Sequence, residues 1–353
     1  MKQLSSYVAR FVLGAIVLVL MVVLGIDVIA ATVDGLDDIR NDYHFIDVLY
    51  HVGLTLPSRI VENIPFATLI GCLIGLGVLA GNSELVIMRA AGVSLLRITV
   101  FVVKPVILVI IVGALLGDFV VPYTDQLAES RKIVLRGEQD SLAATTGIWN
   151  REGNEFIHFN AVHPNGRLFG VTRYRFGDQR NIEEVSFAAQ ATFHDDHWLE
   201  ERGVTTRFIH NGTETDRFET RRWESGLSPD LLQLMSMPAE SLALRSLYDY
   251  ARYLDTHGQK SSVYWLAFWN KALLPATVIG LVLIAVSFIF GPLREATMGY
   301  RVFSGVVVGI VFQTIQKLLG PSSIVFGFSP FWAVLVPAVI SMLIGLVLLR
   351  RAA

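Results

Sequence analysis

Six long, mostly apolar stretches limit what this chain can fold into more than any other feature. A helix needs about 20 such residues to span the hydrocarbon core of a membrane, where every backbone group must hydrogen-bond within the segment. The stretches cover residues 11–31, 64–80, 98–121, 272–290, 302–319 and 330–349, and their only charged residues are Asp27, Lys104, Asp118 and Lys317. We therefore predict six transmembrane helices, three on each side of a polar insert.

The first apolar stretch follows Lys2 and Arg10, as the core of a signal peptide would. Its apolar core is longer than that of a signal peptide, and no small-x-small cleavage site follows it. We predict that it is retained as a transmembrane helix.

Charge is concentrated in the polar insert. Of the 60 Asp, Glu, Lys and Arg residues, 37 lie between positions 122 and 262. This distribution predicts an α-helical membrane protein with an inserted soluble domain: helices one to three in residues 1–121, the domain in residues 122–262, and helices four to six in residues 263–353. A net charge of -2 without a basic stripe argues against nucleic acid. The single cysteine, Cys72, excludes a disulfide framework within the chain.

The basic residues of the short loops indicate the orientation, because Lys and Arg collect on the cytoplasmic side of a membrane. The N-terminus, the loops after helices two and four, and the C-terminus each carry a basic pair: Lys2 and Arg10, Arg89 and Arg97, Arg294 and Arg301, Arg350 and Arg351. Residues 32–47 instead hold five Asp and one Arg. We predict cytoplasmic termini and an insert on the periplasmic side.

The insert has the pattern of short strands separated by turns. Strands are predicted over residues 148–149, 155–159, 168–176, 184–193, 197–201 and 205–209, and helices over residues 123–136 and 236–254. Glu152-Gly153-Asn154, Pro164-Asn165-Gly166 and Asn211-Gly212-Thr213 supply turn residues between them. The insert is therefore predicted to be an all-β antiparallel sandwich or roll with flanking helices.

Motifs for catalysis are missing from the chain. It has no GxxxxGK[ST] phosphate loop, no HExxH and no GxSxG. The run from His194 to His197 has metal-ligand residue types, but we expect it to form a solvated turn between strands, so no metal site is predicted. The chain is predicted not to be an enzyme.

The loop after the second helix, residues 81–92, contains the residue types that typically begin and end a short helix. Asn82 or Ser83 precedes it, Glu84 and Arg89 complement its dipole, and Gly92 ends it. Leu85 and Met88, three residues apart, lie on one face of such a helix. Periodicity alone favours equally a helix lying on lipid head groups and one docking into a partner.

Three segments resemble one family of transporters. They are residues 83–92, SELVIMRAAG, residues 287–294, SFIFGPLR, and residues 298–301, MGYR. These resemble the LptF/LptG family of permease subunits in the lipopolysaccharide exporter of Gram-negative bacteria, and the FGPLR run resembles its LptG branch. The resemblance implies six spans around a periplasmic β-jellyroll-like domain in the inner membrane.

The resemblance also implies partners. These are LptF as heterodimer partner, two copies of the ATPase LptB, LptC and the periplasmic bridge LptA, with lipopolysaccharide as substrate. ATP and Mg would be bound by the ATPase, and no cofactor by this chain. The short helix would then be a coupling helix that contacts the ATPase through Glu84, Leu85, Met88 and Arg89.

An anionic, multi-acylated substrate implies cations near the periplasmic membrane surface. Candidates for the head group are Arg131, Lys132 and Arg136 after helix three, with Arg59 before helix two. The alternative is that they meet ordinary phospholipid head groups. Family members carry lysines at the end of the first helix, where this chain has Asp34, Asp37 and Asp38, so contacts there are not transferred.

The fifth helix combines polar and small residues. Gln313, Gln316 and Lys317 lie together at membrane depth, where polar groups usually face a cavity or a partner, and Gly305 and Gly309 permit close helix contact. The family resemblance implies a lateral gate between helices one and five. Plain packing between helices is the alternative.

The function predicted from these features is that of a permease subunit that extracts lipopolysaccharide with energy from another chain. One rival is a mechanotransmitting subunit that acts through its periplasmic domain without moving lipid. Another is a membrane-anchored enzyme, for which the insert shows no cluster of catalytic residue types.

Overall fold

The computed structural model describes residues 2–39, 42–136, 148–162, 167–177, 181–194, 196–209, 212–227, 237–256, 260–291 and 296–352. The chain divides into two compact units. A helical unit comprises Met1–Ala31, Leu56–Pro122 and Ala239–Ala353. A β unit comprises Thr32–Thr55 and Tyr123–Pro238.

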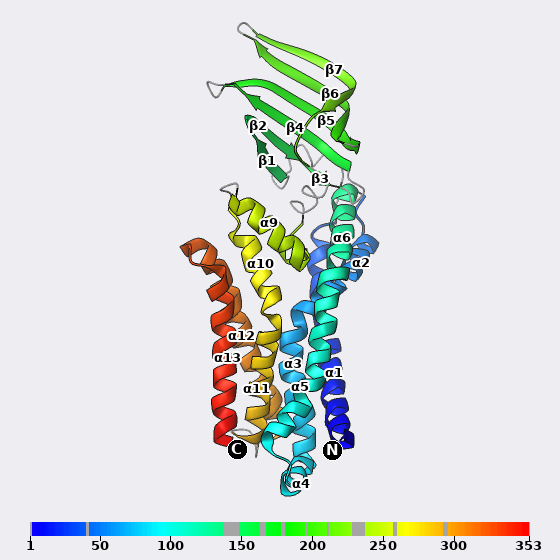
Figure 1. Ribbon diagram of the computed structural model, residues 1–353. Helices are drawn as coiled ribbons and strands as arrows, with labels where there is room; N and C mark the ends of the chain where they lie inside the picture. Colours follow the sequence, from blue (N-terminus) through cyan, green and yellow to red (C-terminus); the bar gives the residue numbers. More distant parts are fainter. Residues whose placement is uncertain are drawn as a thin grey trace. The chain divides into compact units, whose positions relative to one another are not determined.

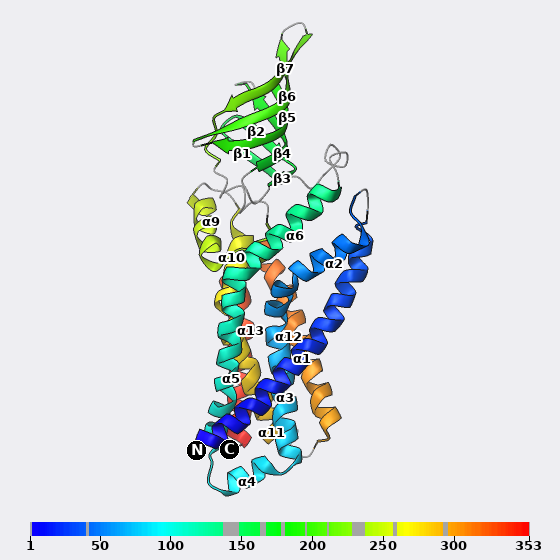
Figure 2. The ribbon, with the colours of Figure 1, turned by 90° about the vertical axis from the view of Figure 1, so that its right-hand side faces the viewer.

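The helical unit is a bundle of long helices (Figures 1 and 2). In chain order its helices are α1 (Lys2–Leu36), α3 (Leu56–Gly81), α4 (Glu84–Ala90), α5 (Leu95–Leu115), α9 (Leu244–Thr256), α10 (Ser262–Ala272), α11 (Leu274–Phe290), α12 (Met298–Phe326) and α13 (Pro330–Ala352). A π-helical turn, Leu116–Val120, continues α5 into α6 (Val121–Arg136), and a 3₁₀ turn covers Ala239–Ser241. Both termini and α4 lie at one end of the bundle (Figures 1 and 2).

Among the described residues, five helices are long and apolar enough to cross a membrane: the helices that begin with α1, α3, α5, α12 and α13. The predicted fourth span, residues 272–290, corresponds to α11, which forms a pair with α10 that is bent by 49°. Pro275 lies at the start of α11, where its missing N–H and its ring interrupt the preceding turn. The pair makes a sixth crossing if it is counted as one span.

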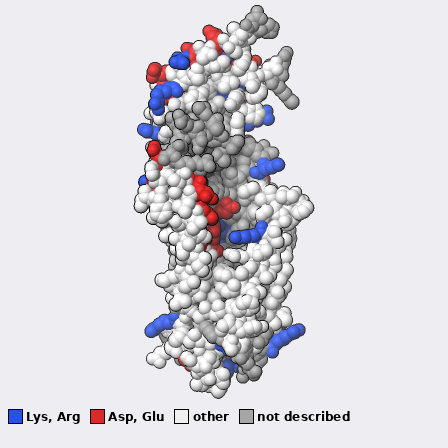
Figure 3. All heavy atoms as spheres, turned by 180° about the vertical axis from the view of Figure 1, so that it is seen from behind, with Lys and Arg blue, Asp and Glu red and all other residues white. Residues whose placement is uncertain are grey.

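The surface of the bundle fits a membrane-embedded helical protein. Figure 3 shows a surface almost free of charge between a strip of Asp and Glu near the middle of the view and Lys and Arg side chains at the end that carries both termini. α3 forms the centre of the bundle: Leu69, Cys72, Leu73, Leu76 and Leu79 are fully buried. In contrast, few residues of α1 and α12 are buried.

The β unit contains one antiparallel sheet with strand order β1-β2-β4-β5-β6-β7, and β3 pairs with β4. Its strands are β1 (Ile148–Glu152), β2 (Glu155–Phe159), β3 (Ala161–Val162), β4 (Arg167–Phe176), β5 (Ile182–His194), β6 (His197–Ile209) and β7 (Gly212–Trp223). The unit also contains α2 (Phe45–Leu54) and most of α6. The prediction of an inserted antiparallel β domain is confirmed, while its jellyroll-like character stays a prediction.

Two strand predictions differ from the structure. Residues 197–209 form one strand, β6, because the pairing with β5 continues on both sides of Arg202, which itself takes a left-handed φ of 53°. β7 was not predicted as a strand: its apolar residues are few because most of its side chains are exposed. The helix predicted over residues 236–254 is confirmed for α9, which starts at Leu244.

The interior of the sheet combines an apolar cluster with a buried ionic network. The apolar cluster consists of Ile157, Phe159, Leu168, Val171, Ala191, Trp198, Trp223 and Leu227. Beside it, the fully buried Glu200 on β6 accepts two hydrogen bonds from Arg173, at 2.9 and 3.1 Å, and one from Arg221, at 2.8 Å. Glu155 on β2 binds Arg173 as well, at 3.1 Å. The network therefore joins four strands through charge-assisted hydrogen bonds.

Candidate functional site

The short helix predicted after the second span exists as α4, at the end of the bundle that holds both termini (Figure 2). Ser83 precedes it with a left-handed φ of 59°, which non-glycine residues seldom adopt. This turn reverses the chain from α3 into α4. Glu84 therefore starts a helix whose position is set by the end of α3.

The two faces of α4 have different surroundings. Leu85 and Met88, predicted to contact a partner, are buried in the bundle's own core. The exposed apolar side chains are instead Val86 and Ile87, with exposed fractions of 55% and 65%. Arg89 is also exposed. Spacing placed Leu85 and Met88 on one face correctly, but that face packs inward, and the opposite face is available to a partner.

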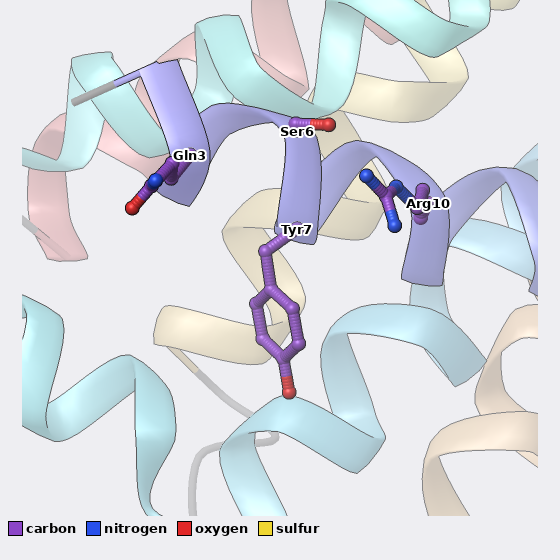
Figure 4. A pocket seen from close by; sticks show the side chains of 4 residues that line it. All are labelled: Gln3, Ser6, Tyr7 and Arg10. Atoms are coloured by element: carbon purple, nitrogen blue, oxygen red, sulfur yellow. The ribbon is translucent and has the colours of Figure 1, made fainter.

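A pocket lies beside the start of the first helix. Figure 4 shows Tyr7 extending from α1, its hydroxyl ending beside a light-blue helix, while Gln3, Ser6 and Arg10 line the same pocket. The pocket has a volume of about 530 Å³.

Arg301 joins the same region to α12. It lies in the first turn of α12, is 5% exposed, and donates from Nη1 to the carbonyl oxygen of Gly77 on α3 at 2.9 Å. Gly77 lies about one turn before α3 ends and leads into α4. The loop arginine that orientation reasoning assigned to a membrane surface is therefore a buried contact between two helices.

Glycine pairs bring α3 close to two other helices. A Cβ on Gly71 would lie 2.5 Å from the Ile16 Cα of α1, and one on Gly75 would lie 3.0 Å from the Val12 Cα. On α12, a Cβ on Gly305 would meet Leu73 of α3 at 2.4 Å, and one on Gly309 would meet Phe66 at 2.6 Å. Both pairs are small-xxx-small motifs that allow helices to approach closely. The Gly71–Gly75 pair is equally visible in the sequence but was missed.

The predicted polar gate residues lie farther along α12. Gln313 and Gln316 are half-buried and Lys317 is exposed. Val306 of α12 packs against a cluster of Val19 on α1 with Ala67 and Ile70 on α3. Gly305 and Gly309 therefore serve packing against α3, and a gate role for Gln313, Gln316 and Lys317 stays a prediction.

Three of the four predicted head-group cations have carboxylate partners. Arg131 binds Asp47 at 2.9 Å, Lys132 binds Asp38 at 2.5 Å, and Arg59 binds Asp27 at 3.1 Å. Arg131 also lies over the Tyr50 ring, 4.5 Å from its centroid. Arg59 belongs to the helical unit and the other two belong to the β unit. Arg136 ends α6, and its side chain lies outside the described residues.

Asp47 has a double role in the β unit. It accepts the His44 backbone N–H at 3.1 Å, which caps α2, while it binds Arg131. These two donors lower the pKa of Asp47, Arg131 being the larger cause. Asp47 therefore remains ionised at neutral pH. The Arg131 side chain is half-exposed, and the carboxylate of Asp47 already compensates its charge.

The residue types for metal binding do not gather in the described parts of the chain. No group of three or more His, Cys, Asp or Glu residues there is arranged to hold an ion. His194 ends β5 and His197 begins β6, as predicted for a turn, and Asp195 between them lies outside the described residues.

Sequence comparisons agree with the segments described above. The model of the lipopolysaccharide export system permease LptF/LptG family matches residues 6–351. The lipopolysaccharide export system permease protein LptG of Escherichia coli K12 is 30% identical over 99% of this chain and 98% of its own length. The LptG protein of Haemophilus influenzae is 31% identical over 96% of both chains. This chain therefore belongs to the lipopolysaccharide export system permease LptF/LptG family.

Proposed function

We propose that this chain is a permease subunit that extracts lipopolysaccharide from the inner membrane and passes it to a periplasmic bridge, driven by ATP hydrolysis in a separate subunit. Family membership over nearly the whole chain and the apolar helices support a multi-pass inner-membrane transport subunit rather than an enzyme. Relatives named as LptG permeases support lipopolysaccharide as the substrate. The partners follow as a proposal: LptF, two copies of LptB, LptC and LptA.

The observation that carries the proposal is the exposed face of α4. A seven-residue helix presents Val86, Ile87 and Arg89 outward while Leu85 and Met88 anchor it in the bundle. A rigid helix with an exposed apolar pair and adjacent charges suits docking into a groove on a partner. We assign this face to the ATPase, with Glu84 and Arg89 as its polar contacts. The ATP and Mg sites then belong to that partner.

The proposed orientation places α4 and both termini in the cytoplasm. Lys and Arg side chains at this end of the bundle support it (Figure 3). The β unit then lies in the periplasm, where its jellyroll-like sheet would pass the substrate on. α1 and α12 border α3 on their glycine-lined contacts, and few of their residues are buried, as in helices of a lateral gate.

Replacing Glu84 with alanine is expected to lower ATP-driven export about 10-fold, because a hydrogen bond between a carboxylate and a partner contributes about 1.5–3 kcal/mol. The measurement is co-purification of the ATPase together with lipopolysaccharide release from proteoliposomes. Replacing the exposed Arg97, in the first turn of α5, with alanine is the matched control. Unchanged co-purification and release in the Glu84 variant would remove this role.

Replacing Asp47 with asparagine is expected to raise the capture of lipopolysaccharide at position 131. The amide oxygen still accepts the His44 N–H, but the charge that competes with a phosphate for Arg131 is gone. Arg131 is half-exposed, so solvent screens its pair with the buried Asp47, and a contribution of about 0.2–1 kcal/mol corresponds to an increase of about 1.5- to 5-fold. Site-specific photo-crosslinking near position 131 measures it, with the Arg131→Ala variant as the baseline. Equal capture in wild type and both variants would favour interfacial cations without a substrate role.

The whole proposal is tested by reconstituting the chain with its permease partner and the ATPase in liposomes that contain lipopolysaccharide. ATP-dependent transfer to the soluble bridge protein is the expected result. ATP turnover without transfer would instead support a mechanotransmitting subunit.

A further inference from the structure

Two side chains of the helical unit join the connections that flank the β sheet. The chain leaves the helical unit after Pro122 and re-enters it at Ala239. We call residues 116–122 the outgoing connection, which contains the π-helical turn, and residues 239–244 the returning connection, which leads into α9. Asp118 and Lys271 hydrogen-bond across them, although Asp118 and its partner Leu244 are 126 residues apart in the sequence.

Pro122 leaves a carbonyl of the outgoing connection without its usual donor. The Val121 N–H donates to the carbonyl of Leu116, five residues earlier, as in a π-helix. In this register the donor for the Gly117 carbonyl would be Pro122, which has no N–H. Gly117 is buried, where a carbonyl without a donor is unfavourable. Lys271 supplies the donor, because its Nζ lies 3.2 Å from the Gly117 oxygen.

The same ammonium also holds the returning connection. Lys271 lies in the last turn of α10, beside the bend between α10 and α11. Its Nζ donates to the Leu242 carbonyl at 2.5 Å as well as to Gly117. An ammonium has three N–H donors, so one side chain can serve both connections at once. A lysine next to a membrane span is costly unless it makes specific contacts of this kind.

Asp118 makes the second link, in the opposite direction. Its Oδ1 accepts the backbone N–H of Leu244 at 2.8 Å, and Leu244 is the first residue of α9. The N–H groups in the first turn of a helix have no acceptor within that helix, and a carboxylate there is favourable. The π-helical turn therefore supplies the acceptor that caps α9.

Other contacts fix α9 along α10, beside which it lies at the end of the bundle opposite the termini (Figures 1 and 2). The Tyr248 ring of α9 lies 5.7 Å from the Trp265 ring and 5.8 Å from the Phe268 ring of α10, measured between centroids. Trp265 also donates from Nε1 to Asp255, near the end of α9, at 2.8 Å. α9 and α10 are thus a packed pair, and Asp118 and Lys271 tie that pair to the end of α5.

From these contacts we infer that Asp118 and Lys271 are positioning residues that clamp the outgoing and returning connections together, so that α5 and the α9–α10 pair move as one piece. Close-packed helices rearrange as discrete pieces rather than deform continuously. Movement of the bundle then reaches both connections at the same time. Its role in transport rests on the proposed function, in which lipopolysaccharide passes from the helical unit to the β unit.

Hydrogen exchange of the full-length chain in nanodiscs tests the clamp directly. Lys271→Met keeps an unbranched side chain but removes the donors. Exchange is expected to rise about 3- to 30-fold in both connections, because the ammonium serves both. The matched control is Lys104→Met, which replaces an exposed lysine of α5 and should leave exchange unchanged.

A pair of substitutions at Asp118 provides the second test. Asp118→Ala removes the acceptor for the Leu244 N–H and is expected to raise exchange about 3- to 30-fold at the start of α9 and in the π-helical turn. Asp118→Asn keeps an acceptor oxygen and should retain most of the protection. Asp249→Ala, which removes a carboxylate of α9 that is 65% exposed, is the matched control and should have little effect.

The complete transporter in liposomes tests the role in transport. Lipopolysaccharide released per ATP hydrolysed is expected to fall about 3- to 10-fold in Lys271→Met and Asp118→Ala, and to stay near wild type in Asp118→Asn. ATP turnover should be unchanged in all three, because the clamp lies at the end of the bundle opposite α4 (Figures 1 and 2).

The outcomes are distinguishable from one another. Exchange that changes in one connection only, or in neither, would overturn the clamp. Faster exchange with a wild-type release ratio would overturn its role in transport. If Lys271→Met does not fold, the comparison of Asp118→Ala with Asp118→Asn decides the question. Failure of the wild-type complex to release lipopolysaccharide would overturn the proposed function, while the exchange results would still decide whether the two connections are clamped.

Discussion

Replacing Glu200 with glutamine is expected to destabilise the β unit by about 3–5 kcal/mol, the usual cost of removing one partner from a buried ionic network. Glu200 is fully buried and neutralises Arg173 and Arg221, of which Arg173 has a side-chain exposure of only 6%. Glutamine keeps the shape but turns an N–H toward a guanidinium. Hydrogen exchange of amides in β4, β6 and β7 of the full-length chain measures the change, and protection should fall by roughly two to four orders of magnitude.

Glu224→Gln is the matched control for this substitution. Glu224 pairs with Arg222 at 3.4 Å, but the two side chains are 80% and 55% exposed. Exposed ion pairs contribute about 0–1 kcal/mol, so protection should change little. Equal effects of the two substitutions would show that burial of Glu200 does not decide its importance.

Replacing Gly71 with alanine is expected to destabilise the helical unit by about 1–3 kcal/mol, as overpacking of a close contact does. The added Cβ would lie 2.5 Å from the Cα and 2.8 Å from the backbone N of Ile16. These are backbone atoms, so α1 must move away from α3. A lower melting temperature of the purified chain and weaker ATP-driven release of lipopolysaccharide are the expected results.

Gly14→Ala provides the comparison on α1. A Cβ there has open space within 4 Å, and alanine favours helix over glycine by about 0.5–1 kcal/mol. This variant should therefore melt at the same temperature as wild type or slightly higher. If both variants behaved alike, the close approach of α1 to α3 would not limit stability.

The helix α4 shows which features of a short helix a local sequence pattern can predict. The residues that begin and end α4 were recognised in the sequence, and its helix is confirmed. The sequence did not predict which face of α4 turns inward, because Leu85 and Met88 could pack against a partner or against the chain itself. The apolar cluster that contains them includes residues of α1, α3, α5, α11 and α13, and tertiary packing brings these helices together.

The charged residues show the same limit. Arg131 and Asp47 are 84 residues apart, and Arg59 and Asp27 are 32 apart, so their pairing depends on how helices meet. Sequence reasoning saw an arginine near a membrane surface in each case. The structure adds a carboxylate that competes with any head group.

The sequence by itself determined that this chain is a helical membrane protein with a β insert, because a membrane span depends on the composition of one continuous segment and a strand on its local alternation and turns. Only the tertiary structure decided that Leu85 and Met88 face inward and that three of the four candidate cations are paired with carboxylates. These features arise from contacts between segments distant in the chain. The stability of such contacts depends on how closely two helices approach each other. Glycines such as Gly71 permit a close approach, but the local sequence pattern does not show which helix will be the neighbour.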